Sequence, residues 1–276
     1  MNALEIRGLT KRRGDFALQG LELTLPAGCI MGLIGENGAG KSTTIRLILN
    51  GLRRDGGTIA VYGKDNRAMT ALDREDIGVV LDEVGLPEYM NAQQIGRMMA
   101  GIFTRWQPEV YRDYLRRLAL PEDKPFKDFS RGMRMRLGLA AALSHQPKLL
   151  LLDEATSGLD PVVRDDILTI LSDFTRDEEH AVLISSHIVS DLEKICDYIA
   201  FLHRGRLLLC EEKDRLTEEY GILRGTTEGI EPAAVCGQRA TPYGTEYLLR
   251  RSAVPAGVPL GQVNIEDLFV FMAKEA

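Results

Sequence analysis

Residues 35–43 read GENGAGKST, and their types and spacing are those of a loop that binds phosphate groups. Glycines allow backbone N–H groups to approach phosphate oxygens, and a helix that starts beside them adds the positive end of its dipole. The Lys41 ammonium would reach the β- and γ-phosphates of a nucleoside triphosphate, and the Ser42 hydroxyl would bind Mg²⁺. The alternative, a glycine-rich turn with a surface lysine, does not explain the predicted strand before the segment and the predicted helix after it. The residues expected to contact the nucleotide are Asn37, Gly38, Ala39, Gly40, Lys41, Ser42 and Thr43.

Two acidic residues, Asp153 and Glu154, follow the apolar run at residues 149–152. At the end of a buried strand, Asp153 would hold Mg²⁺ directly or through water. Glu154 would be the general base, or orient the water that attacks the γ-phosphate. A plain loop boundary can also carry two acids, but a phosphate-binding loop in the same chain favours phosphoryl transfer. The sequence therefore predicts a site for Mg-ATP, with Lys41 and Glu154 as catalytic groups.

The elements that must position these groups are predicted from the spacing of apolar residues. Strands are expected within residues 3–34 and at residues 58–62, 77–81, 149–152, 181–185, 198–202 and 206–209. Helices are expected at residues 40–51, 133–145, 161–174 and 190–196. Between residues 89 and 120 two amphipathic helices are expected. Their apolar faces would carry Ile95, Met98, Met99 and Ile102 in the first, and Val110, Tyr114, Leu115 and Leu118 in the second.

Three further segments resemble the motifs of ABC ATPases. Residues 129–133, FSRGM, are similar to the LSGGQ signature; residues 157–160, SGLD, are similar to the D-loop; and His187 follows a predicted strand as the switch histidine does. The resemblance covers roughly residues 3–210, and few ATPases carry this whole set of motifs. It implies an α/β fold with a RecA-like core, an N-terminal antiparallel β part, and a helical subdomain at about residues 85–145.

The resemblance also implies a composite site. Ser130 and the backbone N–H of Gly132 lie at the start of a predicted helix, which favours anions. In the family this signature, which here includes Met133, binds the γ-phosphate of the ATP held by the opposite subunit, and the switch histidine, here His187, contacts the γ-phosphate. A head-to-tail dimer around two ATP molecules is therefore expected. Whether the second ABC ATPase subunit is identical or different stays open.

The chain departs from the family pattern at three places. The Q-loop glutamine is expected after residues 77–81, where this chain has Asp82, which would still bind Mg²⁺ or hold water. Arg131 replaces a signature glycine; it would either add a phosphate contact or point to solvent. The aromatic residue that stacks on adenine is also displaced. Either Arg13 or Phe16 would take its place, unless Phe16 faces the core instead.

The whole sequence favours a transporter subunit over other ABC machines. A net charge of −6 gives no overall reason to expect nucleic acid, and no run of about 18 apolar residues predicts a membrane helix. The four scattered cysteines favour reduced thiols in the cytosol. We therefore expect a peripheral protein on the cytoplasmic face of the membrane, held there by a separate transmembrane permease. The single ATPase copy resembles the drug- and antibiotic-export branch.

Residues 84–106 are expected to contact the permease. The apolar residues there are Leu86, Tyr89, Met90, Met98, Met99 and Trp106. Methionine-rich surfaces adapt to partner helices, although core packing is the alternative, above all for Met98 and Met99. Two rival functions are a soluble ABC ATPase that remodels a macromolecular complex and a nucleotide sensor with little turnover. A single ATPase copy without a basic tail disfavours the first, and the presence of Glu154 and His187 disfavours the second.

The amino-acid composition and the apolar periodicity both change after about residue 211. Gly, Pro and Thr become frequent and apolar periods weaken until residues 264–274, which predict a helix with Asn264 as its N-cap. Its apolar face would carry Ile265, Leu268, Phe269 and Met272. We expect residues 1–210 to form the ABC ATPase domain and residues 211–276 to form a small module that regulates, dimerises or covers the core.

Overall fold

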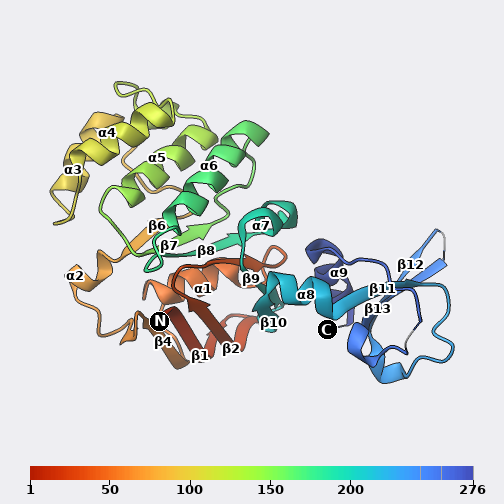
Figure 1. Ribbon diagram of the computed structural model, residues 1–276. Helices are drawn as coiled ribbons and strands as arrows, with labels where there is room; N and C mark the ends of the chain where they lie inside the picture. Colours follow the sequence, from red (N-terminus) through yellow and green to blue (C-terminus); the bar gives the residue numbers. More distant parts are fainter. Residues whose placement is uncertain (243, 256, 276) are drawn as a thin grey trace.

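A computed structural model describes residues 1–242, 244–255 and 257–275. Its centre is a six-stranded sheet with the order β10-β9-β3-β8-β7-β6 (Figure 1). The strands are β3 (Ile30–Ile34), β6 (Ile77–Val80), β7 (Leu149–Asp153), β8 (Ala181–Ser186), β9 (Tyr198–His203) and β10 (Arg206–Glu212). Pairing is parallel from β9 through to β6, and β10 joins β9 as an antiparallel edge strand. The parallel strands therefore end at one edge of the sheet, where ligands bind in open α/β folds.

A second, antiparallel sheet covers one face of the first. It has the order β2-β1-β4-β5, with β1 (Asn2–Arg13), β2 (Phe16–Pro26), β4 (Gly56–Val61) and β5 (Lys64–Asp65). Helix α1 (Lys41–Ile48) shares its apolar cluster, which includes Ile45 and Leu47. The N-terminal antiparallel part implied by the resemblance is thus present.

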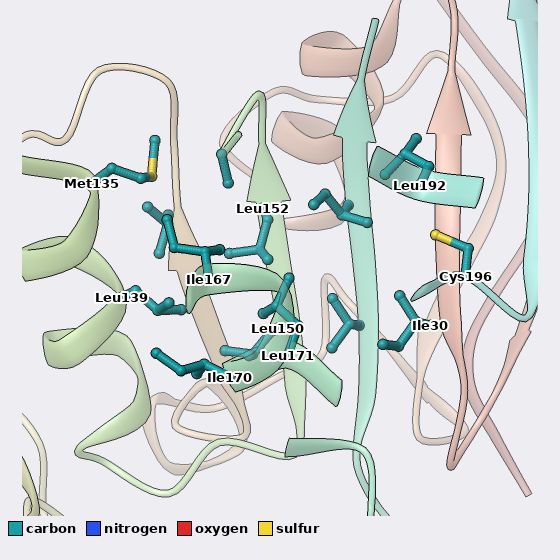
Figure 2. Close-up of a cluster of buried hydrophobic side chains, with 14 of the residues drawn as sticks. Ile30, Met135, Leu139, Leu150, Leu152, Ile167, Ile170, Leu171, Leu192 and Cys196 are labelled. Carbon is teal, nitrogen blue, oxygen red and sulfur yellow. The ribbon is translucent and has the colours of Figure 1, made fainter. Parts of the chain in front are cut away.

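The opposite face of the six-stranded sheet is covered by α5 (Arg131–Leu143), α6 (Pro161–Phe174) and α7 (Val189–Ile195) (Figures 1 and 2). Helices α3 (Ala92–Ala100) and α4 (Pro108–Arg117) pack against α5, and the short α2 (Ala71–Arg74) lies before β6. Side chains of a strand alternate between its two faces, so successive residues of β7 pack into the apolar cores on opposite sides of the sheet. Leu150 and Leu152 pack with the helices, whereas Leu149 and Leu151 pack with the antiparallel sheet.

Both helices of residues 89–120 are present, but the apolar face of each differs from the sequence-based expectation. Helix α3 begins at a capping box made by Asn91 and Gln94 and ends at Ala100, capped by Gly101. Ile102 was expected on its apolar face, but it lies beyond the helix and is 61% exposed. In α4 the fully buried positions are Tyr111 and Leu115. Helix α5 also begins earlier than expected, at Arg131, because Ser130 caps it.

The C-terminal residues form a third sheet that apolar periodicity did not predict. It has the order β11-β13-β12, with β11 (Tyr220–Arg224), β12 (Val235–Thr241) and β13 (Gly244–Arg250). It lies with α8 (Lys213–Glu219) and α9 (Ile265–Glu275) at the end of the molecule away from α3 and α4 (Figure 1). Short 3₁₀ turns occur at Phe126–Asp128, Pro232–Ala234 and Arg251–Ala253.

Helix α9 attaches the C-terminal part to the rest of the chain. Its predicted N-cap is confirmed, since Asn264 Oδ1 accepts a 2.6 Å bond from the Asp267 N–H. Phe271, which the helical spacing missed, is fully buried together with Ile265 and Leu268. The Phe269 ring meets the Phe201 ring of β9 edge-on, with centroids 5.2 Å apart. The C-terminal part therefore shares the apolar core of the helical layer.

Two properties of the described residues bear on the expected setting of the chain. The helices that the structure describes are all too short or too polar to cross a membrane. Within the same residues the four cysteines are free thiols, and burial raises the pKa of Cys210 to about 11. Burial also raises the pKa of Cys196, so both thiols are protonated at neutral pH.

Candidate functional site

The phosphate-binding loop joins β3 to α1 and is wound tightly against its surroundings. Gly40 has a φ of +115°, and a Cβ there would lie 2.7 Å from the Phe16 ring. A Cβ at Gly35 would lie 2.4 Å from the Leu202 carbonyl oxygen. The backbone oxygen excludes a side chain at Gly35, and the positive φ favours glycine at Gly40. The loop thereby keeps its backbone next to α1's N-terminus, where N–H groups lack helical partners.

Lys41, Glu154 and His187 meet at this loop although they come from three separate elements. Lys41 is 5% exposed; its Nζ donates to the Gly35 carbonyl at 2.6 Å and lies 3.1 Å from Glu154 Oε1. His187 Nδ1 lies 2.7 Å from Glu154 Oε2, and the carboxylate can only accept, so Nδ1 carries the proton in this contact. The Glu154 carboxylate therefore links the lysine of the loop to the histidine beyond β8.

Asp153 lies one residue earlier and points into a more buried setting. It is 5% exposed, and its Oδ1 accepts a 2.6 Å bond from the Ser185 hydroxyl of β8. The Glu154 N–H donates to the Ser185 carbonyl and also to Ser185 Oγ. Ser185 thus fixes both acids at the end of β7. Sequence reasoning did not identify it, because its role depends on the pairing of Asp153 with Ser185 across two strands.

A cavity of about 390 Å³ opens beside the loop, a volume within the range of small-molecule sites. Its lining comprises Arg13, Phe16, Glu36, Asn37, Gly38, Gly40, Lys41, Ser42, Thr43, Asp82 and Glu154. Ala39 and Asp153 are buried and are not among the residues that line this cavity. Phe16 packs partly against the apolar core and also lines the cavity. Its expected contact with the base stays a prediction.

The oxygen donors near the loop fit a magnesium ion. Ser42 supplies a hydroxyl and Asp153 a buried carboxylate, and Mg²⁺ prefers such oxygen ligands together with substrate phosphates and water. Asp82 also lines the cavity, but its Oδ1 accepts a 2.5 Å bond from Arg131 Nη2. Arg131 is half-exposed and pairs with Asp82, and it is not among the residues that line this cavity.

Ser130, Gly132 and Met133 lie outside this cavity, at the start of α5. Ser130 Oγ accepts from the Met133 N–H at 3.3 Å and so acts as the helix cap. A different cavity, of about 640 Å³, adjoins α5 and is lined by Arg131, Arg134 and residues from 82 to 88, among others. The residues expected to bind a nucleotide thus form two separate groups within one chain.

The fold and the loop define a P-loop nucleotide-binding protein of the α/β class. A family profile described as ABC transporter matches residues 18–157. The chain is 34% identical to the uncharacterized ABC transporter ATP-binding protein YhcH of Bacillus subtilis, over 93% of this chain and 87% of that protein. It is 32% identical to the bacitracin transport ATP-binding protein BcrA of Enterococcus faecalis, over 82% of this chain and 73% of that protein.

A solved ATP-binding subunit of an ABC transporter has the same fold. It superposes with a TM-score of 0.71 at 26% identity, over 78% of this chain and 92% of that one. The chain therefore belongs to the ABC transporter family, as an ATP-binding subunit that hydrolyses ATP. The match to YhcH reaches well beyond residue 211, so the two proteins share part of the C-terminal region as well.

Proposed function

We propose that the cavity beside the phosphate-binding loop holds ATP and that Glu154 directs its hydrolysis. The observation that carries this proposal is the contact of one carboxylate with both Lys41 Nζ and His187 Nδ1. Lys41 would move from Glu154 to the β- and γ-phosphates, which leaves the carboxylate to accept a proton from the attacking water. His187, at present hydrogen-bonded to Glu154, would contact the γ-phosphate. Residues 37–43 would hold the phosphates, and Arg13 or Phe16 would stack on the base.

Ser42 and Asp153 would hold Mg²⁺ in this site. The ion would neutralise charge that develops on the phosphates during transfer. Ser185 keeps the Asp153 carboxylate in place through the hydroxyl bond that it donates. Asp82 reaches the same cavity and would bind the ion or a water molecule once it is separated from Arg131.

A second ABC ATPase subunit would complete the site. The start of α5, with Ser130, Gly132 and Met133, lies outside the cavity that Lys41 lines. That separation fits a head-to-tail dimer, in which the signature of each chain covers the ATP of the other. ATP binding would close the two chains and hydrolysis would reopen them.

A separate membrane permease would convert this closure into transport. Tyr89 is 77% exposed. A separate groove of about 240 Å³ is lined by Val84, Leu86, Met99 and Phe103 among others. Such a surface, apolar and rich in large side chains, fits a helix of the permease. The chain would then lie on the cytoplasmic face of the membrane. BcrA is named for bacitracin transport, and this likeness favours export.

Steady-state ATP hydrolysis tests the central role of Glu154. We expect the Glu154→Gln variant to lose turnover by at least about 100-fold, because general base catalysis contributes factors of this size. Its affinity for Mg-ATP should be retained. The matched control is Glu36→Gln, which removes a carboxylate from the same cavity at a position that is exposed to solvent. Equal turnover of Glu154→Gln and the unmodified chain would contradict the proposal.

A further inference from the structure

Arg131 joins three segments that are distant in the sequence. It is the first residue of α5, directly after the cap Ser130. Its Nη2 donates to Asp82 Oδ1, which follows β6. Its Nη1 lies beside Gly158, where a Cβ would come within 3.0 Å of it. One guanidinium therefore contacts the end of β6 and the loop after Glu154 while it belongs to the signature helix.

Asp82 stands at the boundary between two cavities. It lines the 390 Å³ cavity with Lys41 and Ser42, and it also lines the 640 Å³ cavity with Arg131. About half of each side chain in the pair is exposed, 50% for Asp82 and 51% for Arg131. A ligand that enters the 390 Å³ cavity therefore meets the Asp82 carboxylate, which is hydrogen-bonded to Arg131 of α5.

The charge of Arg131 is unusual for its position. A helix N-terminus is electrically positive, so a cation in the first turn is disfavoured there and an anion is favoured. The first turn of α5 contains no acidic residue. Asp82 supplies the missing negative charge from another segment, which explains how α5 can begin with an arginine. If the ion pair were broken, the Arg131 guanidinium would lie at the positive N-terminus of α5 without a compensating negative charge from Asp82.

We propose that the Asp82–Arg131 pair is a latch in which Arg131 competes with Mg-ATP for the Asp82 carboxylate. The latch, which rests on the proposed function, holds the start of α5 against the edge of the cavity. Asp82 lines the cavity together with Ser42, so a magnesium ion held there would compete with Arg131 for its carboxylate. Binding therefore separates the pair, and part of the binding free energy is used to do so. Arg131 is a positioning residue in this scheme, because it sets where the signature helix lies.

The latch makes a prediction opposite to that of simple electrostatics. Loss of a positive charge near a polyanion would ordinarily weaken binding of that anion. If Arg131 instead competes for Asp82, Arg131→Gln removes that competing interaction and Mg-ATP binds more tightly. An exposed ion pair limits the gain to about five-fold in Kd. Arg131→Lys keeps a charge that can pair with Asp82, so its Kd should stay near that of the parent.

Calorimetric titration with Mg-ATP measures this effect in the Glu154→Gln background, at protein concentrations where the chain is monomeric. Arg131→Gln should lower Kd about three- to five-fold at low salt, and the difference should vanish at about 0.5 M salt, where the Debye length is short. In an Asp82→Asn background the same substitution should have no effect. The control is Arg116→Gln, which breaks an exposed ion pair with Asp113 within α4 and should leave Kd unchanged.

Three results would overturn the latch: weaker binding by Arg131→Gln, a change below two-fold at low salt, or an equal gain in the Asp82→Asn background. Each can occur while the parent chain still binds Mg-ATP, so the proposed function would survive it. A parent chain that produces no binding heat and shows no ATP hydrolysis would contradict the proposed function and the latch together.

Discussion

Glu154 has a left-handed backbone conformation, with a φ of +54°, at the point where β7 ends. Such a conformation is uncommon for a residue other than glycine and must be held by its surroundings. The Glu154 N–H donates to both the carbonyl and the hydroxyl oxygen of Ser185, which holds the backbone. Lys41 and His187 hold the Glu154 carboxylate. The backbone turn directs this side chain toward the loop, whereas Asp153 stays buried. Two adjacent acids thus obtain different surroundings from one turn.

The two acids and the phosphate-binding loop could be predicted because the residues of each motif lie next to one another in the sequence. Asp153 and Glu154 follow an apolar run, and the glycines, Lys41 and Ser42 lie within nine residues of one another. Ser185 and the Asp82–Arg131 pair could not be predicted in the same way. Each depends on side chains that approach only after strands pair or helices pack, and a single sequence does not encode those distances locally.

Ser185→Ala is expected to lower the free energy of unfolding by about 1–3 kcal/mol, since the buried Asp153 carboxylate loses its hydroxyl donor. Chemical denaturation at neutral pH measures the difference. The control is Ser144→Ala, whose buried hydroxyl donates only to the Ala140 carbonyl of its own helix, so that a smaller loss is expected. A loss for Ser185→Ala no greater than that of the control would show that the bond to Asp153 contributes little.

At the scale of elements, apolar periodicity predicted the strands and helices whose buried faces carry apolar side chains along their whole length. The run at β7 is apolar throughout because both of its faces are covered. Strand β12 has only one buried position, at Gly237, and its backbone pairs with β13. A strand of this kind is stabilised by pairing and by the contact of Gly237 with Phe271, so its apolar pattern is weak. For this reason the third sheet was missed.

The packing of α3 against α4 depends on a glycine. A Cβ at Gly96 would lie 2.6 Å from the Tyr111 ring, which is held in place by a bond from its hydroxyl to the Ala92 carbonyl. Gly96→Ala should destabilise the protein by about 1–3 kcal/mol through overpacking. This outcome opposes helix propensity, which favours alanine by about 1 kcal/mol.

Thermal or chemical unfolding of Gly96→Ala distinguishes the two effects. Gly101→Ala is the matched control, because Gly101 ends the same helix with an ordinary right-handed conformation and its nearest neighbour is its own helix. The control should be neutral or slightly stabilising. Stabilisation by Gly96→Ala would mean that Tyr111 moves aside freely and that this contact does not fix the two helices.

At the scale of the whole molecule, one apolar cluster runs from the six-stranded sheet through α7 to α9. The sequence predicted a change of composition near residue 211 and also the final helix. It did not show that this helix packs against β9 and α7. That contact joins residues far apart in the chain. The division into residues 1–210 and 211–276 remains a prediction, and the shared cluster favours cooperative unfolding of both parts.

Phe271→Ala tests this cooperativity. The side chain is fully buried, so its truncation should cost about 3–5 kcal/mol and shift the whole unfolding transition rather than a part of it. Phe271→Leu should cost less, because it retains most of the apolar volume. Circular dichroism and the fluorescence of Trp106, which lies in the helical layer, should report the same midpoint. Separate midpoints in Phe271→Ala would show that the C-terminal part unfolds independently.

The central claim is that each chain carries two half-sites and closes with a second subunit around ATP. Analytical ultracentrifugation of the Glu154→Gln variant, with and without Mg-ATP, tests it most directly. Removal of the base should leave binding intact and trap the closed state, so we expect a monomer that becomes a dimer only when Mg-ATP is present. A chain that binds Mg-ATP and remains monomeric would contradict closure with a second copy of itself.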